Sequence, residues 1–214
     1  MSKLRFNVTV SLDGFLAGPD QSLEHPLGVG GEDLHRWMFP LAVWRATHGE
    51  TGGEVNASTE VVERWNANVG AYLMGRNMFG GGPGPWRTDE PWNGWWGENP
   101  PYHTPVFVLT NHPREPLALQ GGTTFHFVTE GIAAALERAR AAAGGRDVVI
   151  AGGANAIQQY LAAGLVEEME LSVVPVLLGS GERLLANLGE RRPQLEQVRA
   201  VEAPGVTHIT YRLT

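Results

Sequence analysis

The feature that most constrains this chain is a pair of strand-like apolar runs, each of which ends in glycine and turns directly into a helical pattern. One run covers residues 147–151 and leads through Gly152-Gly153 into a helix-like stretch. The other covers residues 71–74 and leads through Gly75-Arg76. A strand followed at once by a helix is the repeating unit of parallel sheets. The two runs therefore predict an α/β fold.

Both turns have the chemistry of a phosphate site. The first residues of a helix present unpaired backbone N–H groups and the positive end of the helix dipole. Glycine lets a phosphate come close because it has no Cβ, and Arg76 adds a positive charge. Together the turns predict a cofactor with several phosphates. Taken singly, each is equally well an ordinary turn between a strand and a helix.

Periodicity along the rest of the chain agrees with a single α/β domain over residues 1–214. The predicted strands are 4–10, 71–74, 106–109, 124–128, 147–151, 169–178 and 206–213. The predicted helices are 32–39, 59–68, 132–143 and 154–163. We expect a mixed, mostly parallel sheet with helices on both faces, closed by antiparallel C-terminal strands. Local signals predict an Asp13-Gly14 hairpin turn, a Ser58 N-cap, an irregular stretch over 46–57 and a Gly164 C-cap.

Composition excludes several classes of protein. An apolar fraction of 43% and a charged fraction of 18% describe a soluble globular chain. No apolar run has the roughly 18 residues that a membrane span needs, and the N-terminus lacks the apolar block of a signal peptide. A net charge of −7 argues against nucleic-acid binding. The absence of cysteine leaves no disulfide framework, and we expect a cytoplasmic protein.

Residues 80–105 follow neither a helix nor a strand period. This stretch is rich in proline and glycine and contains Trp86, Trp92, Trp95 and Trp96. Long irregular segments inside a domain are usually functional or disordered, and the tryptophans argue against disorder. We predict an ordered loop beside a site, with a purely structural flap as the alternative.

Several kinds of catalytic motif are missing. No H-x-H pair or H-E-x-x-H motif supports a metal site, although His103 and His112 lie in predicted loops and could meet in space. The G-x-S-x-G elbow, the Walker loop and the G-x-G-x-x-G fingerprint are also absent. Dinucleotide redox chemistry remains possible. It requires phosphate-binding turns, an arginine, a polar strand end and a closing loop, and the chain has all four. We predict no metal.

Five segments, in this order along the chain, resemble the dihydrofolate reductase superfamily. They are Ser11-Leu12-Asp13-Gly14-Phe15-Leu16-Ala17, Leu73-Met74-Gly75-Arg76, Val108-Leu109-Thr110-Asn111, Ile150-Ala151-Gly152-Gly153-Ala154 and Val174-Pro175-Val176-Leu177-Leu178-Gly179-Ser180-Gly181. The similarity is greatest to the C-terminal reductase domain of the bifunctional riboflavin-biosynthesis deaminase–reductase and its stand-alone bacterial relatives. It covers nearly the whole chain. The resemblance implies a single dihydrofolate-reductase-like domain that binds NADPH across its strand ends.

The resemblance also implies roles for individual residues. The implied cofactor-binding residues are Val10, Ala17, Gly75, Arg76, Asn77, Thr110, Asn111, Ala151, Gly152, Gly153, Ala154 and Asn155. Among them, Gly75 and Arg76 match a phosphate-binding turn, and Thr110 and Asn111 match the strand end near the adenosine ribose and its 2′-phosphate. The stretch from Val10 to Ala17 matches the strand and mobile loop beside the nicotinamide. The alternatives are a surface ion pair for Arg76 and a helix cap for Thr110.

On the substrate side, the resemblance points to the segment that begins Glu32-Asp33. Dihydrofolate reductases place a carboxylate at the corresponding helix start, and Asp33 is the implied catalytic residue. A carboxylate there could bind an aminopyrimidine or pterin edge and assist proton delivery. Equally, both acidic residues could simply complement the helix dipole. The segment 80–105 looks like an addition to the family pattern that reshapes the pocket.

These observations lead to a functional prediction with two alternatives. We predict an NADPH-dependent reductase of the riboflavin-biosynthesis (5-amino-6-(5-phosphoribosylamino)uracil reductase) or dihydrofolate reductase type. It would transfer hydride to a small heterocyclic or carbonyl substrate. The alternatives are a flavin-dependent reductase, with the aromatic loop stacked on the flavin, and a non-catalytic NADPH-binding sensor or partner module. We also expect a homodimer, formed by pairing of the apolar stretch 171–178 across a two-fold axis.

Overall fold

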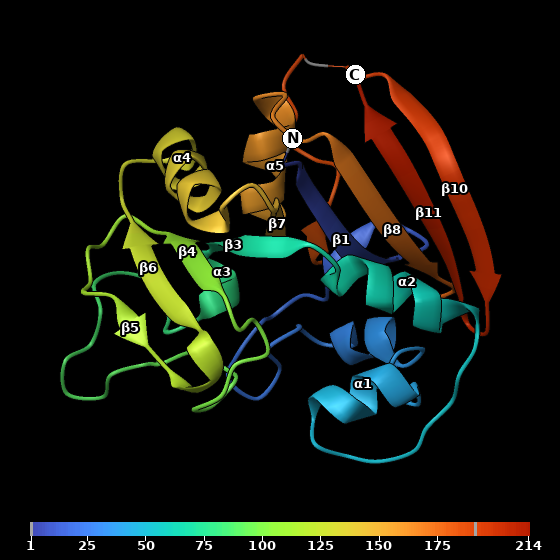
Figure 1. Ribbon diagram of the computed structural model, residues 1–214, viewed down its shortest axis with the longest axis horizontal. Helices are drawn as coiled ribbons and strands as arrows, with labels where there is room; N and C mark the ends of the chain where they lie inside the picture. The colour runs from blue at the N-terminus through green and yellow to red at the C-terminus, as the bar shows by residue number, and fades with distance from the viewer. Residues whose placement is uncertain (1, 191) are drawn as a thin grey trace. The chain divides into compact units, whose positions relative to one another are not determined.

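The computed structural model describes residues 2–190 and 192–214, so Met1 and Arg191 lie outside the described residues. The chain divides into two units by its contacts. The first consists of the residues up to Phe6 together with Asn68–Val166, and the second consists of Asn7–Ala67 and Glu167–Thr214. Strand β1 (Leu4–Ser11) begins in the first unit and continues into the second (Figure 1).

The first unit is built on a mostly parallel sheet. After the start of β1, its strand order is β7-β3-β4-β6-β5. The strands are β3 (Val69–Gly75), β4 (Pro105–Leu109), β5 (Leu117–Ala118), β6 (Thr124–Val128) and β7 (Asp147–Gly152). Every pairing in this set is parallel except that of the short edge strand β5 with β6. The predicted strands of this region are therefore confirmed, whereas the two-residue strand β5 was not predicted.

The helices of the first unit follow the strand-to-helix pattern. They are α3 (Arg76–Phe79), the short 3-10 helix η2 (Gln120–Gly122), α4 (Ile132–Ala143) and α5 (Ala154–Ala162). Helix α4 has the predicted bounds and ends in the left-handed residue Gly144. It packs against β3, β4 and β7 (Figure 1). A Cβ at Gly70 would lie 2.5 Å from the carbonyl oxygen of Ala143, so β3 and α4 touch through their backbones.

The segment before β4 is ordered and covers one face of the first unit's sheet. Val106, Val108, Phe125 and Phe127 are buried on that face. The side chains that pack against this cluster include those of Trp86, Trp92, Trp96 and Tyr102. No helix or strand lies between Gly80 and Thr104, as predicted. In the first unit, this loop takes the place of a helix over β4 and β6.

The second unit contains the antiparallel part of the fold. Its strands are the rest of β1 and β8 (Glu168–Val174), β10 (Leu195–Ala203) and β11 (Val206–Leu213), in the order β10-β11-β8-β1. Strand β11 pairs antiparallel with both β8 and β10. Strands β2 (Phe15–Ala17) and β9 (Glu182–Arg183) form a separate antiparallel pair. The final strand has the predicted bounds, whereas β9 and β10 were not predicted.

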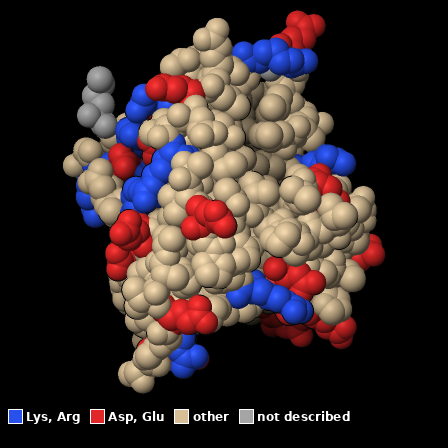
Figure 2. Space-filling view, turned by 90° about the vertical axis from the view of Figure 1, so that its right-hand side faces the viewer, with Lys and Arg blue, Asp and Glu red and all other residues tan. Residues whose placement is uncertain are grey.

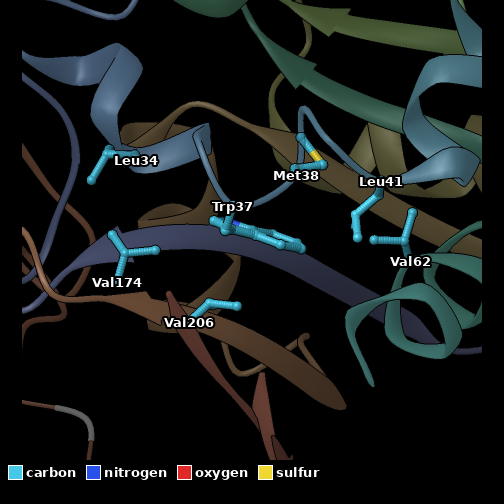
Figure 3. Close-up of a cluster of buried hydrophobic side chains, with 7 residues drawn as sticks. All are labelled: Leu34, Trp37, Met38, Leu41, Val62, Val174 and Val206. Atoms are coloured by element: carbon cyan, nitrogen blue, oxygen red, sulfur yellow. The ribbon is translucent and has the colours of Figure 1, made fainter. Parts of the chain in front are cut away.

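Helical turns of the second unit bury an apolar cluster. They are the 3-10 helix η1 (Gly31–His35), α1 (Ala42–Thr47) and α2 (Ala57–Asn66). Figure 3 shows the cluster, which consists of Leu34, Trp37, Met38, Leu41, Val62, Val174 and Val206. Its members come from η1, the turns after it, α2 and the strands, and so they join the helical layer to the sheet of this unit.

Four local predictions in the second unit need correction. The helix expected over 32–39 is a single 3-10 turn that ends at His35. The stretch expected to be irregular over 46–57 begins inside α1, which ends at Thr47. The N-cap of α2 is Asn56, not Ser58, because the Asn56 side chain accepts a hydrogen bond from the Ser58 N–H in a capping box. The Asp13-Gly14 turn does not form a hairpin, since β2 pairs with β9 and not with β1.

Other predicted boundaries also differ from the structure. The helix predicted over 59–68 is α2, Ala57–Asn66. Strand β8 ends at Val174, short of the predicted residue 178, because Pro175 has no N–H to donate to a strand ladder. Helix α5 ends at Ala162 with Ala163 as its C-cap, and Gly164 is the next residue, with a φ of 69°. Strand β8 lies between β11 and β1, so neither of its edges is open. Dimerisation through residues 171–178, as the sequence suggested, is therefore wrong.

The surface carries no block of one charge on the face shown in Figure 2. Basic and acidic side chains alternate there among large uncharged areas. Within the described part of the chain, every helix is too short or too polar to cross a membrane.

Candidate cofactor-binding site

The carboxyl ends of three parallel strands bring most of the predicted cofactor residues together in the first unit. In the sheet, Met74 of β3 is paired with Gly152 of β7, and Gly75 is paired with Leu109 of β4. Carboxyl ends of parallel strands meet at one edge of a sheet, which is where α/β proteins bind ligands. Both glycine turns and the Thr110 strand end therefore lie side by side.

The turn between β7 and α5 leaves its backbone accessible to a ligand. Gly152 has a φ of 134°, a conformation that side chains other than glycine rarely adopt. The Gly152–Gly153 peptide bond is cis. Gly153 is the N-cap of α5, and a Cβ built on it would meet no atom within 4 Å. The first N–H groups of this nine-residue helix are thus approached through open space at Gly153.

The residues around Gly152 and Gly153 differ in exposure. Ala154 is buried and Ala151 is half-buried, so they contribute mainly through the backbone. Asn155 is exposed, and its side-chain oxygen accepts a hydrogen bond of 2.7 Å from Gln159 within α5. Of this group, Asn155 alone presents a polar side chain to solvent.

The Gly75-Arg76 turn works differently from the turn at Gly153. Helix α3 has only four residues, so its dipole adds little, contrary to the sequence argument. The backbones of the two turns are close, because a Cβ at Gly75 would lie 3.4 Å from the Gly153 nitrogen. Asn77 is exposed. Positive charge at this turn comes from the Arg76 side chain.

The Arg76 guanidinium is held by the loop that follows α3. Its Nε donates to the carbonyl of Gly80 (3.1 Å), and its Nη2 donates to those of Gly81 (3.3 Å) and Gly82 (2.9 Å). The Arg76 Cζ lies 3.1 Å from the ring centroid of Trp86, in a cation–π contact. The Arg76 Nη1 is buried and has no hydrogen-bond partner. Arg76 is therefore not a surface ion pair, and it keeps one donor group unused.

A second arginine, which the sequence analysis did not single out, lies near the same indole. The Arg114 Cζ is 5.1 Å from the ring centroid of Trp86 and 5.1 Å from that of Phe127. Arg114 donates to the Trp92 carbonyl and, at 2.9 Å, to the Asn93 side-chain oxygen. The only signal in the sequence was its position shortly after the β4 strand end.

The two arginines form a cation pair without a counter-charge. Within residues 2–190 and 192–214, neither Arg76 nor Arg114 forms an ion pair with a carboxylate. Burial lowers the pKa of the Arg76 guanidinium, and the neighbouring Arg114 lowers it further. Like charges held this close repel each other and favour a bound anion. We call Arg76, Trp86 and Arg114 the cation cluster.

At the end of strand β4, the hydroxyl of Thr110 caps the turn that follows. The Thr110 N–H donates to the Val128 carbonyl (3.1 Å), and the Thr110 hydroxyl accepts from the His112 N–H (3.1 Å). This side chain caps a turn. No helix lies in residues 111–116, so the alternative of a helix cap at Thr110 is not borne out. Asn111 is exposed, and its side chain stays available at the strand end.

The remaining predicted cofactor residues lie in the second unit, where they are buried. Val10 and Ala17 are 5% and 6% exposed, so only their backbones could face a ligand. Between them, Asp13 ties two loops together. Its carboxylate accepts from the Ser11 hydroxyl (2.6 Å) and the Leu178 and Gly179 N–H groups (3.2 and 2.7 Å). The Ser11 hydrogen bond, followed by those backbone groups, lowers the pKa of Asp13 to about 2.

Asp33, the predicted catalytic carboxylate, sits in the 3-10 helix η1 of the second unit. It forms an ion pair with Arg36 at 2.6 Å, and the two side chains are 43% and 76% exposed. This is an i,i+3 pair at the surface. A ligand that binds the Asp33 carboxylate must therefore compete with Arg36.

A buried polar network elsewhere in the second unit is fully paired. His208, 1% exposed, is hydrogen-bonded through Nε2 to the Ser58 hydroxyl (2.9 Å) and through Nδ1 to the Ser172 hydroxyl (2.8 Å). Burial, aided by the charges of Arg64 and Arg199, lowers the pKa of His208 to about 4. Beside it, Glu170 accepts from Arg64 (3.1 Å) and from Thr210 (3.1 Å).

The fold resembles several solved structures over the full chain. A riboflavin biosynthesis protein of Shewanella sp. PV-4 is 22% identical, with all of this chain and 99% of that chain covered and a TM-score of 0.63. RibD of Acinetobacter baumannii is 18% identical, with a TM-score of 0.58, and this chain covers 58% of it. Dihydrofolate reductase of Enterococcus faecalis, solved with NADP(H), is 11% identical, with 99% and 96% of the two chains covered and a TM-score of 0.50. The fold is thus that of dihydrofolate-reductase-like proteins.

The sequence places the chain within one family of that class. The family model for the RibD C-terminal domain matches residues 2–209, so the chain belongs to the RibD C-terminal domain family. The chain is accordingly a reductase of the riboflavin-biosynthesis type. A comparison with curated protein sequences finds no match.

Proposed function

We propose that this reductase uses NADPH and that the cation cluster binds the cofactor's 2′-phosphate. The observation that carries the proposal is the pairing of Arg76 and Arg114 around one indole with no carboxylate partner in the described part of the chain. A phosphate monoester brings close to two negative charges at neutral pH. It would relieve the repulsion between the two guanidinium groups.

The glycine turn after β7 supports the same proposal. The open space at Gly153 gives a pyrophosphate access to the N–H groups at the start of α5. Glycine at position 152 is required by its backbone conformation. The two phosphate groups would then be held by different chemistry: backbone N–H groups at one turn and arginine side chains at the other.

When bound, NADPH supplies the hydride, and the chain's own residues bind the cofactor and the substrate and orient them. We propose that the backbone from Val10 to Ala17 faces the nicotinamide, with Asp13 holding this stretch to Leu178 and Gly179. The predicted role of Asp33 on the substrate side stays a proposal, and its ion pair with Arg36 does not favour it. The proposed substrate is a small pyrimidine-type heterocycle such as 5-amino-6-(5-phosphoribosylamino)uracil.

The flavin alternative has less support from the aromatic loop. Its rings are already engaged within the first unit. The Trp86 ring is covered by Arg76, and Trp92 and Trp96 pack edge-on against Trp95 and Tyr102. A flavin would have to displace these contacts before it could stack.

The test is a titration of the protein with NADPH and with NADH, followed by tryptophan fluorescence. We expect NADPH to bind at least about tenfold more tightly than NADH, since only NADPH has the 2′-phosphate. Arg114→Met should remove most of that difference while leaving NADH binding nearly unchanged. Equal affinities of the wild type for the two cofactors would contradict the proposal. NADPH binding without oxidation in the presence of pyrimidines or pterins would favour the sensor alternative.

We also propose a cytoplasmic homodimer. Strand β10 lies at the edge of the second unit's strand order, and most of its residues are exposed. An exposed strand edge can pair with a second copy. Light scattering of the purified protein tests this, and a monomeric mass at micromolar concentration would contradict it.

A further inference from the structure

A methionine of the first unit lies against the glycine turn after β7. Met78 is the third residue of α3, which follows β3, and β3 is paired with β7 in the sheet (Figure 1). A Cβ built on Gly152 would lie 3.1 Å from the Met78 Sδ and, apart from the adjoining residues, would meet no other atom within 4 Å. On the side where a Cβ would project, the thioether is therefore the group that faces Gly152.

Met78 differs from the other methionines in its exposure. The chain has five methionines and no cysteine. Of the four methionines that the structure describes, three are buried: Met38, Met74 and Met169 are 9%, 0% and 2% exposed. Met78 is half-buried, so part of its side chain reaches solvent. Within residues 2–190 and 192–214, Met78 alone carries its sulfur on a side chain that is not buried.

A partly exposed thioether can be oxidised by a hydroperoxide to the sulfoxide. A lone pair of the sulfur attacks one peroxide oxygen, the O–O bond breaks, and that oxygen stays on the sulfur. With hydrogen peroxide, the other oxygen leaves as hydroxide, which takes the proton from the transferred oxygen and becomes water. The sulfur loses two electrons and the peroxide gains them. The product is a polar S=O group in place of an apolar sulfur.

An oxygen atom on the Met78 sulfur would stand at the turn that we propose to receive the pyrophosphate. The apolar sulfur places no negative charge beside Gly152 or the open space at Gly153. A sulfoxide oxygen carries partial negative charge, and it would repel the phosphate oxygens at short range. NADPH and NADH both contain the pyrophosphate, so oxidation should weaken the two dinucleotides by the same factor.

We infer that Met78 is an oxidation site, where a hydroperoxide converts the thioether to the sulfoxide and thereby weakens dinucleotide binding. This rests on the proposed function, because it takes the turn at Gly152 and Gly153 as the place of the pyrophosphate. Methionine sulfoxide is returned to methionine by sulfoxide reductases. The modification is thus reversible, and it acts at a different point of the site from the cation cluster.

The first experiment treats the purified protein with hydrogen peroxide and follows the methionine-containing peptides by mass spectrometry. We expect Met78 to gain an oxygen at least about tenfold faster than Met38, Met74 or Met169, because methionine oxidation follows exposure. Equal rates at Met78 and the buried Met74 would overturn the inference.

The second experiment measures the dissociation constants of NADPH and NADH before and after peroxide treatment, by fluorescence titration. We expect both constants to rise about fivefold in the wild type. Met78→Leu removes the sulfur and should abolish the rise. Met74→Leu, which changes a buried methionine of the same unit, is the matched control and should show the full rise. Met78→Gln, whose amide oxygen stands in for the sulfoxide oxygen, should weaken both dinucleotides without peroxide.

Reversal completes this experiment. Treatment of the oxidised wild type with methionine sulfoxide reductases for both sulfoxide epimers should restore the original constants together with the original mass of the Met78 peptide. Constants that stay high after the peptide has returned to its original mass would assign the loss to other damage.

The remaining outcomes separate this inference from the proposed function. A rise of the same size in Met78→Leu, or no rise in wild type whose Met78 is fully oxidised, would overturn the inference and leave the proposed function standing. A rise for NADPH alone would assign the effect to the cation cluster and overturn the inference as well. If the untreated wild type binds neither dinucleotide, the proposed function fails, whereas the peptide map still decides whether Met78 is the oxidation site.

Discussion

Half-buried arginines have opposite kinds of partner in the two units. In the second unit, Arg64 is paired with Glu170, and the Glu170 carboxylate also accepts from Thr210. In the first unit, Arg76 and Arg114 share one indole and have only carbonyl and amide oxygens as partners. The first arrangement leaves no buried side-chain atom of Arg64 or Glu170 without a partner, whereas the second leaves a buried donor and excess positive charge. Unpaired donors and charges are typical of ligand sites, whereas fully hydrogen-bonded groups are typical of structural positions.

The largest effect should follow from breaking the satisfied pair. Arg64→Met leaves the Glu170 carboxylate, which is 8% exposed, without its cation. We expect the free energy of unfolding to fall by about 3 kcal/mol, measured by urea denaturation. NADPH affinity should stay the same. The control is Arg212→Met, which breaks an exposed pair with Glu196 and should cost less than about 1 kcal/mol. Equal losses in the two variants would remove the distinction drawn between the pairs.

A smaller loss of stability is expected on acidification. The pKa of His208 falls from 6.5 to about 4 in the folded chain, so the unfolded state takes up the proton first. The contribution of the neutral ring is complete above pH 6.5, is lost as pH falls towards 4, and changes no further below that. The serine hydroxyls can turn their lone pairs toward a charged ring, which limits the loss. Urea midpoints across this range measure it, and His208→Gln should flatten the profile. A wild-type profile as flat as that of the variant would contradict the assignment.

NADPH binding at the cation cluster should weaken as the salt concentration rises. Raising the ionic strength from about 0.05 to about 0.5 M should weaken NADPH binding by about fivefold, because screening acts on partly exposed charges. NADH, which lacks the 2′-phosphate, should show a shallower dependence in the same fluorescence titration. Parallel salt dependences for the two cofactors would mean that the cluster does not bind this phosphate.

The smallest effect is expected from the helix cap of α2 in the second unit. Asn56→Ala removes the capping box at the start of α2 and should lower the free energy of unfolding by about 1 kcal/mol. NADPH affinity should not change. The pH profile is not part of this baseline, because the cap holds Ser58, whose hydroxyl is hydrogen-bonded to His208. A change in NADPH affinity would contradict the purely local role of the cap.

The sequence predicted the parallel part of the fold more accurately than the antiparallel part. The bounds of β6, α4 and β11 agree with the structure because each apolar run there ends at a clear glycine or polar boundary. Strand β10 was missed because its residues are mostly exposed, so no hydrophobic alternation marks it. The short elements β5 and β9 depend on their pairing partners and leave no local signal.

The candidate site shows a similar division. The glycine turns were predictable, because a backbone that must approach a ligand requires a particular residue, as at Gly152. Arg114 was not predictable, since its value depends on Arg76 and Trp86 meeting it in space. Asp33 was singled out by its place in the chain, but its pairing with Arg36 could be read only from the structure. Contacts between residues that are far apart in the sequence cannot be predicted from the spacing of residues.

The contact between β3 and α4 at Gly70 has a consequence for how this protein can change over time. A Cβ there would stand 2.5 Å from the Ala143 carbonyl oxygen, closer than real atoms come. Every missense change that a single base can make in a glycine codon adds a Cβ. Every amino-acid substitution of Gly70 that a single base change can produce would therefore push helix α4 away from strand β3. In a saturation mutagenesis library selected for folded protein, Gly70 should be among the first positions to lose all its variants.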